Sequence, residues 1–151
     1  MASKAAEKQK IVTIFGGTGF VGRYIVHDLA KTGAIIKVAT RAPECGYFLK
    51  TYGDTGQIVP VACNYRDEKA VTDLVAGSDY VVNCIGILNQ KRKKSTFQRI
   101  HQDLPEIIAK ACKKHKIKRF VHISALGAEN GVSKYACSKL AGEKLLSLIH
   151  I

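Results

Sequence analysis

Short apolar runs alternate with amphipathic stretches along most of the chain. Five of the runs are rich in Val and Ile and apolar throughout, as expected of strands in a parallel sheet that is covered on both faces. These predicted strands are Ile11–Phe15, Ile35–Thr40, Ile58–Cys63, Tyr80–Ile85 and Arg119–Ser124. Helical periodicity is found in Val21–Lys31, Asp67–Val75, about Phe97–His115 and Lys134–Leu148. The segment Pro43–Tyr52 fits neither pattern.

The regular alternation of strand and helix predicts an α/β fold, in which a doubly wound parallel sheet carries helices on both faces. The polar segment Met1–Lys10 is expected to be a leader that precedes the domain, which spans residues 11–151. The last predicted helix runs almost to Ile151, whereas a six-stranded doubly wound sheet needs a further strand after it. We therefore expect the sheet to be incomplete at its C-terminal end.

A glycine-rich turn, Gly16–Gly22, follows the first strand and opens the first helix. Gly16 permits a sharp exit from the strand, Gly19 lets a phosphate approach the backbone, and Gly22 lets the helix pack closely on the sheet. Free N–H groups and the positive end of the helix dipole then favour a pyrophosphate. The strand–turn–helix context makes this motif more specific than its glycines alone. It predicts a Rossmann-type dinucleotide site, with a purely structural turn as the alternative.

The end of the second predicted strand bears on the choice of cofactor. An NAD site carries an acidic residue there, about 20 residues after the glycine turn, to hold the ribose 2′-hydroxyl. This chain instead has Arg41, and no carboxylate follows until Glu44. A guanidinium binds a 2′-phosphate as a charged fork, whereas a carboxylate would repel it. The sequence therefore favours NADP(H), with NAD(H) as the second choice and an exposed surface arginine as the alternative for Arg41.

A Ser, Tyr and Lys constellation is a candidate for acid–base chemistry. Tyr135 and Lys139 are four residues apart on a predicted helix, so both side chains lie on one face. The ammonium favours the phenolate and makes Tyr135 a usable acid or base, and Ser124 could hold a substrate oxygen beside it. The spacing alone is weak, because Tyr65 and Lys69 repeat it. Only the first pair follows a strand that ends in Ser, on the side where hydride chemistry is possible.

Taken together, these features resemble the short-chain dehydrogenase/reductase superfamily, in its atypical branch related to the extended NAD-dependent epimerase/dehydratases. The more specific similarity is to the NADPH-binding accessory subunits of respiratory complex I and their bacterial relatives. The segments that carry this similarity are Phe120–Ala128, Val82–Leu88 with Asn83, and Gly142-Glu143. The resemblance covers nearly all of Ile11–Leu146.

The resemblance implies which residues surround the cofactor and which do chemistry. The implied cofactor-binding residues are Gly16, Thr18, Gly19, Phe20, Gly22, Arg41, Gly86, Tyr135 and Lys139, and the implied catalytic residues are Ser124, Tyr135 and Lys139. The chain departs from the family pattern at Ile100-His101, where relatives often have a Val-Asn pair, and at Asn64, where an Asp is usual. We expect His101 to be a half-buried helix residue, which puts a proton-relay role at that position in doubt.

The resemblance also implies a longer protein with two further strands and a small C-terminal substrate or docking region. Two function classes follow. The first is a complex I accessory or assembly subunit that holds NADP(H) structurally. The second is a working NADP-dependent reductase or epimerase/dehydratase that acts on a sugar nucleotide or another small carbonyl or hydroxyl substrate. A redox-sensing binder is a third reading, and the sequence names no substrate.

The formal net charge of +12 is the least expected bulk property. Its sources are dispersed over Lys91–Lys94, Lys110, Lys113, Lys114, Lys116, Lys118 and Arg119. A solvated surface explains them most simply; an acidic protein or membrane-edge partner is the alternative, and the lack of interleaved aromatics disfavours nucleic acid. No apolar run is long enough for a membrane helix, so we expect a cytoplasmic location, or a peripheral one at the inner face of the respiratory membrane.

The chain has five cysteines, an odd number, and no two of them form a CxxC pair. The sequence therefore predicts neither a metal site nor a disulfide framework. Cys63 and Cys84 fall in strand-like runs and are expected to be buried free thiols in a reducing compartment.

Overall fold

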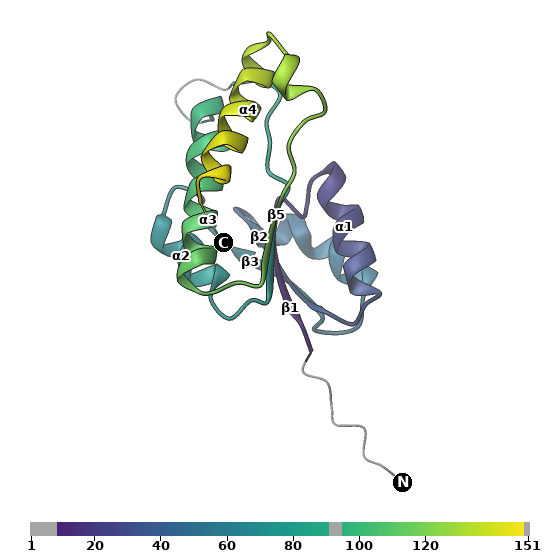
Figure 1. Ribbon diagram of the computed structural model, residues 1–151. Helices are drawn as coiled ribbons and strands as arrows, with labels where there is room; N and C mark the ends of the chain where they lie inside the picture. The colour runs from purple at the N-terminus through teal and green to yellow at the C-terminus, as the bar shows by residue number, and fades with distance from the viewer. Residues whose placement is uncertain (1–8, 91–94, 150–151) are drawn as a thin grey trace.

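A five-stranded parallel sheet forms the centre of the computed structural model, which describes residues 9–90 and 95–149 (Figure 1). The strands are β1 (Ile11–Phe15), β2 (Ile35–Thr40), β3 (Ile58–Ala62), β4 (Tyr80–Asn83) and β5 (Arg119–His122). They lie in the order β3-β2-β1-β4-β5, and all neighbouring pairs are parallel. This confirms the predicted α/β fold with a doubly wound sheet. Most of the predicted leader (residues 1–8) and the basic run 91–94 lie outside the described residues.

The helices are α1 (Phe20–Ala30), η1 (Pro43–Tyr52), α2 (Glu68–Val75), η3 (Gln98–Asp103), α3 (Leu104–Lys114), η4 (Ala128–Asn130) and α4 (Lys134–Ser147). The ambiguous segment is thus a 3₁₀ helix, η1, with Pro43 at its start. The predicted helix Phe97–His115 is helical but begins as a π-helix, η3. A local cause is Pro105, which has no N–H to donate to the carbonyl of His101 four residues earlier.

The two faces of the sheet are covered by different helices. In Figure 1, α1 lies on one side of the sheet, and α2 and α3 lie on the other. Successive residues of β1 point to opposite faces, so Ile14 and Phe15 enter separate cores. The core under α1 and η1 includes Val26, Ile36, Val38, Leu49 and Ile58. The core under α2 and α3 includes Val71, Val75, Val81, Leu104 and Ile108.

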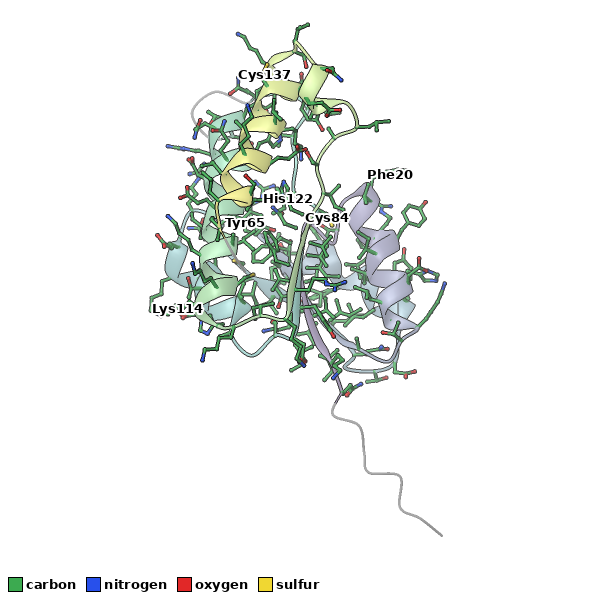
Figure 2. The ribbon with its side chains drawn as sticks, in the orientation of Figure 1. Phe20, Tyr65, Cys84, Lys114, His122 and Cys137 are labelled. Atoms are coloured by element: carbon green, nitrogen blue, oxygen red, sulfur yellow. The ribbon has the colours of Figure 1, made fainter. Side chains whose placement is uncertain are left out.

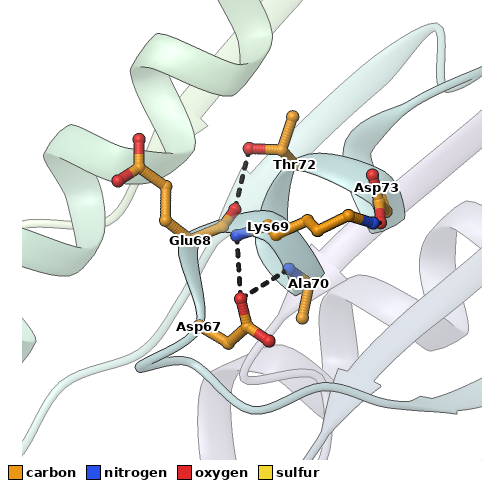
Figure 3. A network of polar contacts seen from close by, with 6 residues as sticks. All are labelled: Asp67, Glu68, Lys69, Ala70, Thr72 and Asp73. Atoms are coloured by element: carbon orange, nitrogen blue, oxygen red, sulfur yellow. Dashed lines mark hydrogen bonds and ion pairs between the residues drawn. The ribbon is translucent and has the colours of Figure 1, made fainter.

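Strands β3, β4 and β5 end one or two residues earlier than the sequence predicts. The cause is visible at β4, where the Asn83 Oδ1 accepts the Ile85 N–H at 3.0 Å. This local turn takes the backbone out of the sheet before the apolar run ends. Helix α2 begins in a similar way, because the Asp67 carboxylate accepts the N–H groups of Lys69 and Ala70 (Figure 3).

All five cysteines are free thiols. Cys63 is buried, as predicted, and burial raises its pKa to about 11. Cys84 is only partly buried, although burial again raises its pKa to about 11. Cys112 is fully buried on α3, whereas Cys45 and Cys137 are exposed. Within the described residues, no helix is both long enough and apolar enough to cross a membrane.

Candidate functional site

The predicted site residues meet at the carboxyl end of the sheet. Because all strands are parallel, the segments that follow them share one edge, and α4 lies beyond that edge (Figure 1). The glycine turn follows β1, and the other predicted residues follow β2, β4 and β5 or lie on α4: Arg41, Gly86, Ser124, Tyr135 and Lys139.

The glycine turn needs glycine for three separate reasons. Gly16 has φ +79°, a left-handed conformation, and a Cβ there would lie 3.0 Å from the carbonyl carbon of Cys84. Gly17 is buried, and a Cβ would lie 2.8 Å from Val38 Cγ1. A Cβ on Gly22 would lie 2.1 Å from the Gly16 oxygen. Gly22 therefore packs α1 against the turn itself, where the sequence predicted packing against the sheet.

Gly19 differs from its neighbours because it is exposed and has φ −77° and ψ 178°, which any residue can adopt. Its own N–H donates to the Gly16 oxygen at 3.0 Å. It is the N-cap of α1, with no side chain capping the helix and no acidic residue in the first turn. The backbone donors of this turn and the positive helix end thus fit an anionic group. The exposed Phe20 and the half-buried Thr18 flank this surface.

Arg41 is exposed directly after β2 and lines a cavity of about 860 Å³. The cavity lies between the ends of β2 and β3 and the helical segment η3–α3. Among the described residues, its charged lining consists of Arg41, Arg66, Arg99 and Asp103. Glu44, the first carboxylate after β2, belongs to η1 and is not part of this lining. The lining is therefore predominantly positive, which suits a phosphate.

Lys139 and Gly86 lie close together at this edge of the sheet. The Lys139 side chain is buried, with 4% of its surface exposed, and its ammonium donates to the Ile123 carbonyl at 3.2 Å. A Cβ on Gly86 would lie 3.4 Å from Lys139 Nζ, so the glycine backbone is packed close to this amine. Burial lowers the pKa of Lys139.

Tyr135 and Ser124 lie in the same region but are engaged elsewhere. The Tyr135 ring makes edge contacts with His101 and Phe97, at centroid distances of 5.5 and 6.2 Å. Within the described residues, no hydrogen bond joins its hydroxyl to Lys139 or Ser124. The Ser124 hydroxyl instead donates to the carboxylate of Glu143. The structure thus gathers the three predicted catalytic residues without linking them into one hydrogen-bonded set.

His101 is fully buried, so the expectation of a half-buried residue was wrong. Its Nε2 accepts the Ile87 N–H at 3.0 Å, and its Nδ1 lies 2.8 Å from Ser138 Oγ. Because that hydroxyl donates to the Tyr135 carbonyl, Nδ1 must carry the hydrogen and the ring is neutral. Burial, with the charge of Lys139, lowers the pKa of His101 to about 4. His101 therefore joins the segment after β4 to the helix that carries Tyr135.

A second neutral histidine lies at the end of β5. The buried Asn83 donates through Nδ2 to His122 Nδ1 at 3.1 Å, so the hydrogen of this imidazole is on Nε2. That Nε2 is buried and has no hydrogen-bond partner in the described residues. Burial and the nearby Lys139 lower the pKa of His122 to about 4.

The second Tyr/Lys pair is not a dyad. The Tyr65 hydroxyl donates to the Ala39 carbonyl at 2.8 Å, and burial raises the pKa of Tyr65 to about 12. Lys69 is exposed and pairs with Asp73 instead (Figure 3).

With this geometry in place, sequence comparison identifies the family. The profile of the NAD dependent epimerase/dehydratase family matches residues 12–150. The chain belongs to this family. The description of this family as NAD dependent agrees with a nicotinamide dinucleotide as the ligand.

Similar epimerase/dehydratase sequences include subunits of a respiratory complex. The chain is 36% identical over 137 residues to the Arabidopsis thaliana NADH dehydrogenase [ubiquinone] 1 alpha subcomplex subunit 9, covering 89% of this chain and 34% of that protein. It is 33% identical over 138 residues to the Neurospora crassa NADH-ubiquinone oxidoreductase 40 kDa subunit, covering 91% and 36%. The chain thus spans about a third of the length of these relatives.

A solved structure supports the fold. The Escherichia coli NADPH-dependent quinone oxidoreductase QOR2 in complex with NADPH superposes with a TM-score of 0.71 at 24% identity. The match covers 93% of this chain and 46% of that protein.

Two residues of the candidate site were not predicted as site residues. Glu143 is four residues after Lys139 and eight after Tyr135, so helical spacing alone places it on their face of α4. Ser138 gave no such signal, because its partner His101 lies 37 residues away.

Proposed function

We propose that this chain is the nucleotide-binding part of an accessory or assembly subunit of respiratory complex I, and that it holds NADP(H) as a structural group. The complex I subunits among its relatives support the association. The hydrogen bond from Ser124 to Glu143 is the observation that favours a structural nucleotide over catalytic turnover. In this arrangement the serine hydrogen is committed to a carboxylate of the protein, so it is withheld from a reacting substrate.

The preference for NADP(H) rests on the charge around the cavity after β2. Among the described residues, the charges of its lining belong to Arg41, Arg66, Arg99 and Asp103, and Asp103 also accepts a hydrogen bond from the side-chain amide of Gln98. A 2′-phosphate beside Arg41 would gain charge-assisted hydrogen bonds that a 2′-hydroxyl cannot make to the same extent. When bound, the dinucleotide would supply a hydride carrier. The residues holding it would be the glycine turn for the pyrophosphate, Arg41 for the 2′-phosphate, and Lys139 with Gly86 for the nicotinamide half.

The function is tested by separating nucleotide binding from chemistry in cells. Gly19→Val obstructs the phosphate site, whereas Tyr135→Phe removes only the acid–base hydroxyl. For a structural nucleotide, the first variant is lost from the isolated respiratory complex and the second is retained, because bound ligand stabilises the native state by mass action. Retention of the Gly19→Val subunit contradicts the proposal.

Turnover is tested on the purified protein by following NADPH absorbance with carbonyl substrates and quinones. We expect no oxidation above the rate without protein. Oxidation that falls by about 100-fold in Tyr135→Phe would establish the reductase class instead.

A further inference from the structure

A dense cationic segment lies at the end of the molecule opposite the candidate site. Residues 113–119 contain five cations and no acidic residue: Lys113, Lys114, Lys116, Lys118 and Arg119. They follow one another through the last turn of α3, the turn after it and the first residue of β5. Figure 2 shows Lys114 at one end of the molecule and Phe20, in the glycine turn, toward the other. We call residues 113–119 the basic end.

Part of this charge is neutralised by the fold, because Lys118 is in an ion pair and Lys114 lies near enough to Asp73 to lower the pKa of that carboxyl. All five cations of the basic end are exposed. Lys118 pairs with Asp79 at 2.7 Å, and Lys10 adds a further positive charge near the same carboxylate. Within the described residues, the other four cations have no carboxylate within salt-bridge distance. The surface is therefore strongly positive where it meets solvent.

The backbone adds an independent observation. Lys116 has φ +52° and is the only non-glycine residue with positive φ in the described part of the chain. Its N–H donates to the Lys113 carbonyl, and the Ile117 N–H donates to the Cys112 carbonyl. This is the Schellman end of a helix, whose left-handed position normally carries Gly because a side chain there is strained. The chain thus holds a cation at a position where glycine would be more stable.

We propose that the basic end is a docking surface for an anionic lipid membrane. Lysine predominates, and none of the exposed large hydrophobic side chains lies between residues 113 and 119. A protein partner typically needs buried aromatic or arginine anchors, and lysine is depleted at such interfaces. A charged lipid surface needs only accumulated positive charge within a Debye length. Docking at this end leaves the nucleotide site at the opposite end of the sheet accessible.

The test compares two sets of substitutions that remove equal charge. The purified protein is sedimented with phosphatidylcholine vesicles that contain or lack phosphatidylglycerol. The first variant carries Lys113→Gln, Lys114→Gln and Lys116→Gln; the control carries Lys31→Gln, Lys50→Gln and Lys144→Gln, at exposed positions outside the basic end. We expect the first to lose on the order of 100-fold in affinity for the anionic vesicles and the control less than tenfold. Equal losses would mean that only bulk charge matters and would overturn the proposal.

A single substitution separates docking from folding. Lys116→Gly relieves the left-handed strain, so this variant should be more stable yet bind anionic vesicles several-fold more weakly. Unchanged vesicle binding in this variant contradicts the proposal. The proposal is also contradicted if the unmodified protein does not bind anionic vesicles at low salt. This includes the case in which it binds an acidic protein instead. None of these results depends on nucleotide binding or on association with a respiratory complex.

Discussion

A single added methyl group should have different effects at two glycines of the same turn. At Gly22 it should lower the stability of the fold, and at Gly19 it should lower the affinity for NADPH. In Gly22→Ala the new Cβ would lie 2.1 Å from the Gly16 oxygen and 2.7 Å from the Gly17 Cα, both backbone atoms. The turn must then move by about an ångström, and such overpacking costs roughly 1–3 kcal/mol, against a gain of about 1 kcal/mol in helix propensity. We expect a net loss of up to about 2 kcal/mol in the free energy of unfolding without ligand.

Gly19→Ala should leave the fold nearly unchanged. Its backbone already has an ordinary extended conformation, and the nearest atom to the new Cβ is the Gly16 oxygen at 3.2 Å. We expect a stability change below about 1 kcal/mol, because a tight contact is offset by lower entropy of the unfolded chain. The methyl group would, however, stand where a phosphate approaches the helix start, so NADPH affinity should fall by at least about tenfold.

Urea unfolding without nucleotide and fluorescence titration with NADPH measure the two effects. Gly33→Ala is the control, because Gly33 lies outside the glycine turn, has φ +76° and has no atom within 4 Å of its Cβ position. It should lose about 1 kcal/mol from strain and retain NADPH affinity. Wild-type affinity in Gly19→Ala would refute the assignment of this turn as the phosphate site. Undiminished stability in Gly22→Ala would refute the packing argument.

Three further predictions follow from single side chains. Arg41→Asp should reverse the preference for NADPH over NADH in a binding titration, and equal affinities in the unmodified protein would contradict the role of Arg41. Lys116→Gly should raise the free energy of unfolding by about 1 kcal/mol, measured as a higher urea midpoint; a lower midpoint would contradict the strain at this position. His101 has a pKa of about 4 in the folded state against 6.5 ordinarily, so the stability due to its neutral form is complete above pH 6.5 and declines as the pH falls toward 4. Between pH 7 and pH 5, the titration of His101 should lower the free energy of unfolding by about 2 kcal/mol, and this loss should be absent in His101→Asn. An unchanged pH dependence of stability in that variant would contradict the buried neutral imidazole.

The sheet and its first turn could be predicted because their signals are local. Each strand is a short run of β-branched residues, and the glycines of the first turn are adjacent in the sequence. Strand ends were less predictable, because apolar character continues past Asn83 although its side chain ends the strand. The π-helix at the start of the third long helical segment has a local cause in Pro105, but periodicity alone does not distinguish it from an α-helix.

The positions of the candidate site residues in the fold were predictable, and the hydrogen bonds that they make were less so. The glycine turn, Arg41 and Lys139 lie where sequence placed them, at the carboxyl end of the sheet. The engagements of Ser124 with Glu143, and of His101 with Ile87 and Ser138, join separate segments of the chain. Such pairs depend on how α4 packs on η3, where a Cβ on Gly142 would lie 2.0 Å from the His101 oxygen.

The hydrogen bond between Ser124 and Glu143 also determines which kinds of molecule could hydrogen-bond to Ser124. A hydroxyl has one hydrogen to donate and two lone pairs that accept. While Ser124 gives its hydrogen to Glu143, only its lone pairs face an incoming molecule. An alcohol, which brings its own hydrogen, could then donate to Ser124, whereas a ketone or aldehyde oxygen would meet only another acceptor. While this hydrogen bond persists, Ser124 would therefore favour an alcohol over the corresponding ketone or aldehyde.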